Sequence, residues 1–284
     1  MLDHIAKKKA RLAFVAEQPC VIEEIQYGIA GDFPLTATIY KPKIKSAKPS
    51  PAVVYIHGGG FTGGERDQFE ANAAYFTTHG YIGLCISYRL APNDKFPSQV
   101  QDAKCAVRWL RAHASNLNID PDRIAVCGAS AGGCISALVA YAQGVKEFAD
   151  QGGNPGISDQ VQAAIFQCGI YDFMPRTMPF GILDSVKKSY LGGKYEDLPQ
   201  VFKKASPIEY VGKNSPPTLL FHGDADETVN VKHGYLLSDK LKANGIYHEL
   251  YIAEGGSHSA YIFLMPHFMI ALKQMEAFLL KVFK

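Results

Sequence analysis

The sequence of 284 residues contains no apolar run near the roughly 18 residues that a membrane-spanning helix needs. Its first residues also lack an apolar core followed by a small-residue cleavage site, which is the mark of a secretory signal. We therefore expect a cytoplasmic protein that has no membrane partner.

Neither sign of charge is in excess, because 29 Lys and Arg stand against 27 Asp and Glu. The basic residues are scattered apart from Lys7, Lys8, Lys9 and Arg11. Such a cluster is more typical of the solvated face of a short helix than of a phosphate-binding surface. We therefore expect no nucleic-acid partner.

The six cysteines show no C-x-x-C spacing, and most of them lie inside apolar strand or helix patterns. A free thiol in such a pattern packs as a small hydrophobic side chain. We expect reduced, structural cysteines and no catalytic cysteine. The nine histidines show no H-E-x-x-H or similar ligand spacing, so we also expect no metal.

No Pro/Ser/Gly-rich linker divides the chain, and α/β folds reach about 250 residues as one unit, so we expect a single domain over residues 1–284. After an N-terminal helix, two strand-like runs at 21–29 and 35–40 flank a Gly-Asp-Phe-Pro turn signal. This pattern predicts an antiparallel pair.

From residue 52 onward, apolar runs that read as fully buried strands alternate with helical segments. The predicted strands are 52–56, 81–86, 124–127, 163–168, 218–221 and 249–252. One apolar stripe predicts a crossover helix over 102–117, and another predicts a C-terminal helix over about 266–283. The alternation predicts a doubly wound, mostly parallel α/β sheet.

The stretch from about 171 to 217 interrupts this alternation with six prolines, several aromatic residues and a short helical piece near 184–190. An insertion of this length inside a compact domain is usually a functional loop. We interpret it as a small lid over the site.

Gly128-Ala129-Ser130-Ala131-Gly132 follows the predicted strand 124–127 and opens the apolar helical segment 134–141. This is the G-x-S-x-G nucleophile elbow in its required strand–turn–helix setting. The small residues at 128 and 132 permit close backbone approach and a strained turn that raises Ser130 above the sheet. Ser130 is therefore the predicted nucleophile.

His57-Gly58-Gly59-Gly60-Phe61 ends an earlier strand, and its glycines leave backbone N–H groups uncovered. Acyl transfer needs such donors for the oxyanion of the tetrahedral intermediate. Our candidates are Gly59, Gly60 and Ala131. A turn without chemical purpose and a phosphate loop are the alternatives, although no G-K-[ST] follows.

Two further pieces, His222-Gly-Asp-Ala-Asp226 and Glu254-Gly-Gly-Ser-His258, stand beyond later strands. Serine, then acid, then histidine is the chain order of α/β-hydrolases, and parallel strands collect such loops at one edge. We predict His258 as the base and Asp226 as its acid. Asp224 is the alternative acid, although we expect it to cap the turn instead.

These motifs, with Tyr88-Arg-Leu-Ala-Pro92, together resemble the hormone-sensitive-lipase-like carboxylesterases of the α/β-hydrolase fold over roughly residues 50–265. Ala205-Ser-Pro-Ile208, before Pro216-Pro217, further resembles the bacterial small-lid branch with feruloyl-esterase-like and acetyl-esterase-like members. The resemblance implies a cofactor-free monomer or small homo-oligomer. At 255–259 the chain departs from the Gly-His-Gly-Phe type sequence that relatives often carry.

The residues predict hydrolysis of a small-molecule ester through an acyl-enzyme on Ser130. The modest length of the lid suggests short acyl groups, and the resemblance implies that small aromatic esters are also possible substrates. Phe61, Tyr88 and Phe173 are the candidate substrate-binding residues under the lid. Two alternatives stay open. One is a serine peptidase of the prolyl-oligopeptidase type, which usually carries a large propeller domain. The other is a ligand-binding protein of the same fold without catalysis.

Overall fold

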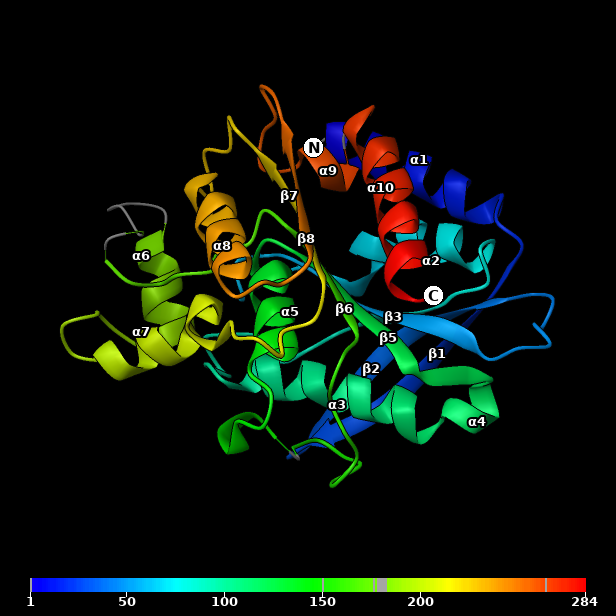
Figure 1. The fold of residues 1–284 in the computed structure, drawn as a ribbon, viewed down its shortest axis with the longest axis horizontal. Helices are drawn as coiled ribbons and strands as arrows, with labels where there is room; N and C mark the ends of the chain where they lie inside the picture. The colour runs from blue at the N-terminus through cyan, green and yellow to red at the C-terminus, as the bar shows by residue number, and fades with distance from the viewer. Residues whose placement is uncertain (1, 150, 176, 178–182, 264) are drawn as a thin grey trace.

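A computed structural model describes residues 2–149, 151–175, 177, 183–263 and 265–284. Within them, eight strands form one sheet in the order β1-β2-β4-β3-β5-β6-β7-β8 (Figure 1). The strands are β1 Cys20–Ala30, β2 Phe33–Pro42, β3 Ser50–Ile56, β4 Ile82–Ile86, β5 Ile119–Ala129, β6 Ala163–Gln167, β7 Thr218–Gly223 and β8 His248–Ala253. β2 pairs antiparallel with β1 and β4, and the other neighbours are parallel.

Helices cover both faces of the sheet because successive strand residues point to opposite sides. In β3, Val54 packs with the cluster that includes helices α3, α5 and α8, whereas Val53 packs with the cluster that includes α1, α2 and α10. These six helices are α1 Leu2–Ala16, α2 Glu70–Thr77, α3 Ser98–Ala112, α5 Ala131–Tyr141, α8 Lys232–Ala243 and α10 His267–Val282. The predicted doubly wound, mostly parallel α/β sheet is therefore confirmed.

Short helical pieces connect these elements. They are α4 Ala114–Leu117, α6 Leu183–Val186, α7 Pro199–Ala205, α9 Ala260–Phe263, the 3₁₀ turns η1 Arg66–Phe69, η2 Lys146–Phe148 and η4 Pro207–Tyr210, and the π-helical turn η3 Lys187–Leu191. The predicted crossover helix over 102–117 is in fact two helices, α3 and α4. The break falls at His113, whose φ of −100° and ψ of 11° leave the helical region.

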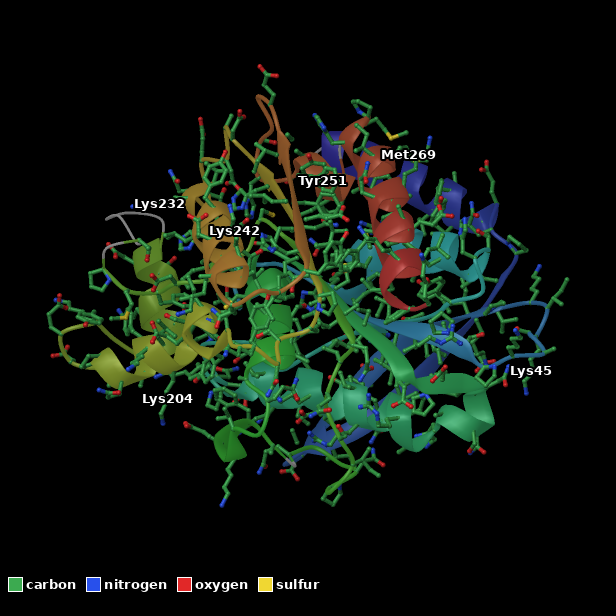
Figure 2. The ribbon with its side chains drawn as sticks, in the orientation of Figure 1. Lys45, Lys204, Lys232, Lys242, Tyr251 and Met269 are labelled. Carbon is green, nitrogen blue, oxygen red and sulfur yellow. The ribbon has the colours of Figure 1, made fainter. Side chains whose placement is uncertain are left out.

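The predicted antiparallel pair at the N-terminal side is β1 and β2, and the predicted C-terminal helix is α10. No helix within the described ranges is long and apolar enough to cross a bilayer. The four lysines labelled in Figure 2 come from three parts of the chain: Lys45 follows β2, Lys204 lies on α7, and Lys232 and Lys242 lie on α8.

The segment from 171 to 217 contains α6, η3, α7 and η4 and no strand among its described residues; 176 and 178–182 lie outside them. The predicted short helix near 184–190 corresponds to α6 and η3. The segment also holds α7, which the sequence did not predict. Tyr190 and Phe202 from this segment are fully buried in the main core. That the segment acts as a lid stays a prediction.

Candidate functional site

Ser130 stands at the turn between β5 and α5 with φ 55° and ψ −120°. The strain is tolerated because glycines on either side let the backbones meet. A Cβ at Gly132 would lie 2.1 Å from the carbonyl oxygen of Ile56, and one at Gly128 would lie 2.3 Å from that of Gly132. The structure therefore has the nucleophile-elbow geometry that the G-x-S-x-G spacing predicts.

Three predicted residues meet at the carboxyl edge of the sheet. His258 Nε2 lies 2.9 Å from Ser130 Oγ, and His258 Nδ1 lies 2.7 Å from Asp226 Oδ2. Ser130 follows β5, Asp226 follows β7 and His258 follows β8, so parallel strands collect the three side chains from distant parts of the chain. The imidazole bridges a hydroxyl and a carboxylate.

Asp226 is held by hydrogen bonds to both carboxylate oxygens. Oδ1 accepts the backbone N–H groups of Thr228 and Val229, each at 2.8 Å. Oδ2 faces both His258 and the buried ring of His222, whose Nε2 lies 3.2 Å away. Burial alone raises the pKa of Asp226, but the bonds from His222 and His258 outweigh it and hold the pKa well below its ordinary value. The acid is therefore ionised in the folded protein.

His222 also belongs to the site. It is the first residue of the motif that contains Asp226, and the sequence analysis gave it no role. It is 1% exposed, and its Nε2 also lies 2.8 Å from the carbonyl oxygen of Val229. Its position four residues before the acid was the available signal. The His222 ring therefore contacts two residues of the loop that carries the acid, Asp226 and Val229.

The role expected of Asp224 belongs to Asp226 itself. Within the described chain, the Asp224 side chain is exposed and has no hydrogen-bond partner, whereas Asp226 accepts the N–H groups of the turn. The expectation that Asp224 caps the turn was therefore wrong. The carboxylate that caps the turn also faces the histidine.

His258 carries a raised pKa. Burial lowers it, but the hydrogen bond to the ionised Asp226 and the neighbouring Cys168 side chain raise it above the ordinary value near 6.5. A carboxylate beside the ring favours the imidazolium. The pKa of His258 in the folded protein therefore lies above that of a free imidazole.

The glycine loop lies directly against the elbow. A Cβ at Gly58 would lie 2.9 Å from the carbonyl oxygen of Ala129 and 3.1 Å from Ser130 Cβ. Gln68, another residue the sequence did not single out, accepts the Gly58 N–H on Oε1 at 2.6 Å. Gly59 and Gly60 have φ of 127° and 62°, a backbone region that favours glycine.

The predicted oxyanion donors have no acceptor inside the described structure. No hydrogen bond is formed by the N–H of Gly59 or Gly60, and Ala131 is the first residue of α5, whose N–H has no intrahelical partner. The N–H of Ser130 donates to the carbonyl of Gln167 at 2.8 Å. Free N–H groups beside a nucleophile are what an oxyanion hole requires.

The three candidate substrate-binding residues are all buried. Phe61 stacks on Tyr190 with ring centroids 3.7 Å apart, and Phe173 lies 6.4 Å from Phe61. Tyr88 stacks on His57 and donates its hydroxyl to the His57 carbonyl at 2.9 Å. Tyr88 therefore supports the glycine loop, and contact of all three with substrate stays a prediction.

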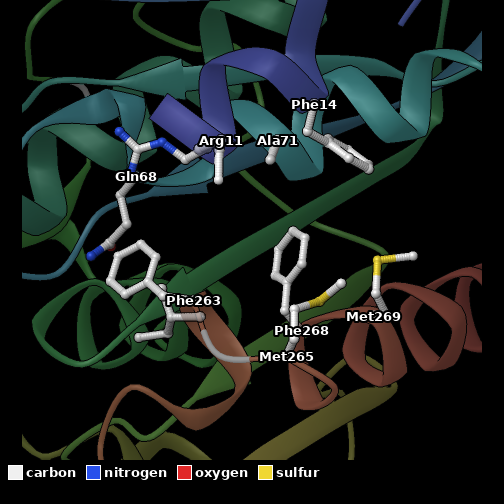
Figure 3. A pocket seen from close by; sticks show the side chains of 10 residues that line it. Arg11, Phe14, Gln68, Ala71, Phe263, Met265, Phe268 and Met269 are labelled. Carbon is white, nitrogen blue, oxygen red and sulfur yellow. The ribbon is translucent and has the colours of Figure 1, made fainter. Parts of the chain in front are cut away.

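An apolar cavity of about 180 Å³ lies between α1, α2, α9 and α10 (Figure 3). Phe14 and Phe268 meet edge to face across it, with ring centroids 6.4 Å apart. Its lining contains none of Ser130, Asp226 and His258. Gln68 lines this cavity and also accepts the Gly58 N–H of the glycine loop. The cavity therefore lies next to a residue that supports the glycine loop, and it is not lined by the proposed reacting groups.

Cys168 stands at the centre of the site, which the sequence analysis did not foresee. All six cysteines are free, as expected, but the Sγ of Cys168 lies with an Asp226 oxygen and a His258 nitrogen in a group whose atoms are all within 4.8 Å of one another. The sequence analysis placed Cys168 at the end of the predicted strand 163–168, whereas β6 ends at Gln167, so Cys168 follows its strand as Ser130 and Asp226 follow theirs. Because the sequence analysis treated every cysteine as structural, it did not predict that Cys168 lies beside Asp226 and His258.

The BD-FAE family model matches residues 37–241. Among curated proteins, the chain is 32% identical over 72% of its length to Esterase LipC of Mycobacterium tuberculosis and 29% identical over 84% to Esterase LipQ of the same organism. Those matches cover 51% and 56% of the two relatives, so the chain spans about half the length of these curated proteins.

Solved esterases share the fold over almost the whole chain. Esterase Est2 of Thermogutta terrifontis with propionate bound is 28% identical with a TM-score of 0.79, and the match covers 92% of this chain and 94% of that one. Other structures of that esterase contain butyrate or are phosphonylated by sarin. The likeness extends well beyond the segment that the family model matches.

Proposed function

The chain belongs to the BD-FAE family, and from that premise we propose that it is a serine carboxylesterase that acts through Ser130, His258 and Asp226. Its relatives are named esterases, which confirms the resemblance to hormone-sensitive-lipase-like carboxylesterases. The observation that carries the proposal is the continuous hydrogen-bond path from Ser130 Oγ through the imidazole to Asp226.

In the proposed mechanism, His258 Nε2 accepts the Ser130 proton as Oγ attacks the ester carbonyl. Asp226 holds Nδ1 protonated, so the lone pair faces the serine, and it stabilises the imidazolium that forms. The N–H groups of Gly59, Gly60 and Ala131 receive the oxyanion. His258 then protonates the leaving alcohol and later activates the water that releases the acid.

Short acyl or small aromatic esters are the proposed substrates. Two observations support this class. The aromatic side chains of Phe173 and Tyr190, both from the 171–217 segment, pack with Phe61, and the 28% identical Est2 structures contain propionate or butyrate. We expect kcat/KM to be highest for acyl chains of about two to six carbons in a p-nitrophenyl ester series. A steady rise toward about twelve carbons would contradict the small acyl pocket.

A fluorophosphonate probe tests the reaction class. We expect covalent labelling at Ser130 in the full chain, loss of labelling in Ser130→Ala, and loss of ester hydrolysis in the same variant. Folded protein that is neither labelled nor active would favour the ligand-binding alternative. Hydrolysis of a proline-containing peptide in preference to esters would favour the peptidase.

The cytoplasmic location and the monomer or small homo-oligomer expected from the sequence belong to the same proposal. Size-exclusion chromatography with light scattering tests the oligomeric state directly.

A further inference from the structure

Cys168 follows the strand that lies between the strands of the serine and the acid. β6 lies between β5 and β7 in the strand order. Ser130 follows β5, Asp226 follows β7, and Cys168 is the first residue after β6. The His258 imidazole, which is hydrogen-bonded to both Ser130 and Asp226, therefore lies over the end of β6, close to the Cys168 thiol.

The backbone holds Cys168 in an unusual conformation. Its φ of 44° is in the left-handed region that non-glycine residues rarely occupy. Its N–H donates to the carbonyl of Phe221 at 2.8 Å, which ties the residue to β7. The residue is 3% exposed. Such outliers cluster at functional sites, where the surrounding structure fixes them.

The three side chains form a ligand set for a soft divalent cation. Thiolate, imidazole and carboxylate are the groups that bind Zn²⁺ in proteins, and sites with three protein ligands leave a fourth position for water. Tetrahedral ligand atoms lie about 3.5 Å apart at ordinary zinc bond lengths. The atoms of Cys168, Asp226 and His258 lie within 4.8 Å of one another, so each separation differs from that spacing by no more than about 1.3 Å.

We propose that Cys168, Asp226 and His258 form an inhibitory site for a thiophilic divalent cation of the zinc class. Binding releases the thiol proton to solvent, together with the second ring proton where His258 is an imidazolium, and the cation takes the one lone pair of the neutral imidazole. A neutral imidazole has one lone pair, so none is left to accept the Ser130 proton. The inhibitory effect rests on the proposed esterase function, whereas the binding does not.

Access to the site is through the histidine side. The His258 side chain is 19% exposed, whereas that of Asp226 is fully buried. An ion therefore approaches over the imidazole, whose Nε2 also lies 2.9 Å from Ser130 Oγ. On this proposal, the ion occupies the base that the serine needs.

Binding is measured first with Cd²⁺, which reports a thiolate ligand through its ultraviolet charge-transfer band. We expect the metal-free full chain to bind one Cd²⁺ with this band, and Cys168→Ser to lose it. Cys20→Ser is the matched control, because Cys20 is a half-buried free thiol far from the site in sequence, and it should keep the band. A band that persists in Cys168→Ser, or disappears in Cys20→Ser, overturns the site.

Inhibition is measured with Zn²⁺ on a p-nitrophenyl ester, with each variant compared with its own rate in EDTA. We expect Cys168→Ser to need at least about tenfold more Zn²⁺ for half-inhibition than wild type. Equal sensitivity in the two proteins, both folded by circular dichroism, contradicts the proposal.

The variant Ser130→Ala, which retains all three ligands, tests the cation site separately from the esterase function. This variant should bind Cd²⁺ like the wild type although it hydrolyses nothing. A wild type that binds Cd²⁺ through Cys168 but cleaves no ester refutes the esterase and leaves the site standing. An active esterase without the band refutes the site alone.

Discussion

Asp226 accepts the turn's N–H groups on one oxygen and faces two histidines with the other, so a single carboxylate serves both the turn and the site. In Asp226→Asn, an NH2 group takes the place of one carboxylate oxygen, and an NH2 group cannot accept a hydrogen bond from His258 Nδ1. We expect Asp226→Asn to lower kcat by roughly 10⁴, the scale seen when a triad carboxylate no longer holds the histidine tautomer. Steady-state assays on one activated ester measure this.

The matched control is Asp224→Asn, at an exposed carboxylate two residues away. Because the Asp224 side chain has no hydrogen bond within the described chain, we expect near wild-type kcat and a change in unfolding free energy within about 0.5 kcal/mol. If Asp224→Asn is the inactive variant and Asp226→Asn keeps its activity, the assignment of the acid is reversed.

The raised pKa of His258 sets the pH dependence of the proposed reaction. The base must be neutral, and the Asp226 carboxylate favours the charged ring, so activity is lost as pH falls through a pKa above 6.5. We expect the acid limb of kcat/KM to have its midpoint above pH 6.5. The residual activity of Asp226→Asn should titrate lower, because the charge that raises the pKa is gone; an unshifted midpoint would contradict this cause.

At the scale of elements, the segment around η3 is tied to the core more firmly than a lid hypothesis alone implies. Tyr190 is fully buried and stacks on Phe61, and its carbonyl accepts the N–H of Phe96 at 3.0 Å. If the segment were only a lid, deleting residues 174–198 would alter substrate range more than folding. A deletion that includes Tyr190 removes part of the main core.

Single substitutions separate these contributions. We expect Tyr190→Ala to lower the free energy of unfolding by about 3 kcal/mol or more, as for other large buried aromatic residues. The Tyr190 hydroxyl is buried without a partner in the described part of the chain, so Tyr190→Phe should be neutral or stabilising. Glu196→Ala, at an exposed position of the same segment, is the control. Urea denaturation measures all three, and equal losses for Ala and Phe would contradict the packing argument.

For the whole molecule, buried histidines set how stability depends on pH. Burial, with the neighbouring His222, lowers the pKa of His233 to about 4. The unfolded state binds a proton near 6.5 and the folded state resists it, so stability is lost as pH falls from about 6.5 toward 4. The raised pKa of His258 acts in a higher window, where its contribution is lost as pH rises above 6.5.

We expect the urea-derived free energy of unfolding to fall by about 2 to 3 kcal/mol between pH 6.5 and pH 4.5 through His233. His233→Gln should flatten this slope while it keeps an acceptor near the Tyr171 N–H, which His233 Nδ1 now accepts at 3.4 Å. A slope that is unchanged in the variant assigns the effect to other groups.

Much of this architecture could be predicted from the sequence, because buried parallel strands read as continuous apolar runs and the elbow has a fixed glycine spacing. Ser130, Asp226 and His258 could be placed by the same strand-end rule. Cys168 was missed because its residue type suggested packing and because the apolar run 163–168 placed it inside the strand and not after it. The burial of Phe61 and Tyr88 could not be predicted, since it depends on Tyr190 and His57 partners that no local pattern encodes.

The bond between His258 and Ser130 joins residues 128 positions apart, and the acid and base follow the last two strands of the sheet. Contacts of such long sequence separation form late during folding, because chain closure must come before them. Ester turnover should then recover after the far-ultraviolet dichroism in a refolding time course. The rate at which hydrolysis of a fluorogenic ester recovers would then report when β7 and β8 dock onto β6. Simultaneous recovery of turnover and dichroism would show that the sheet assembles in one step.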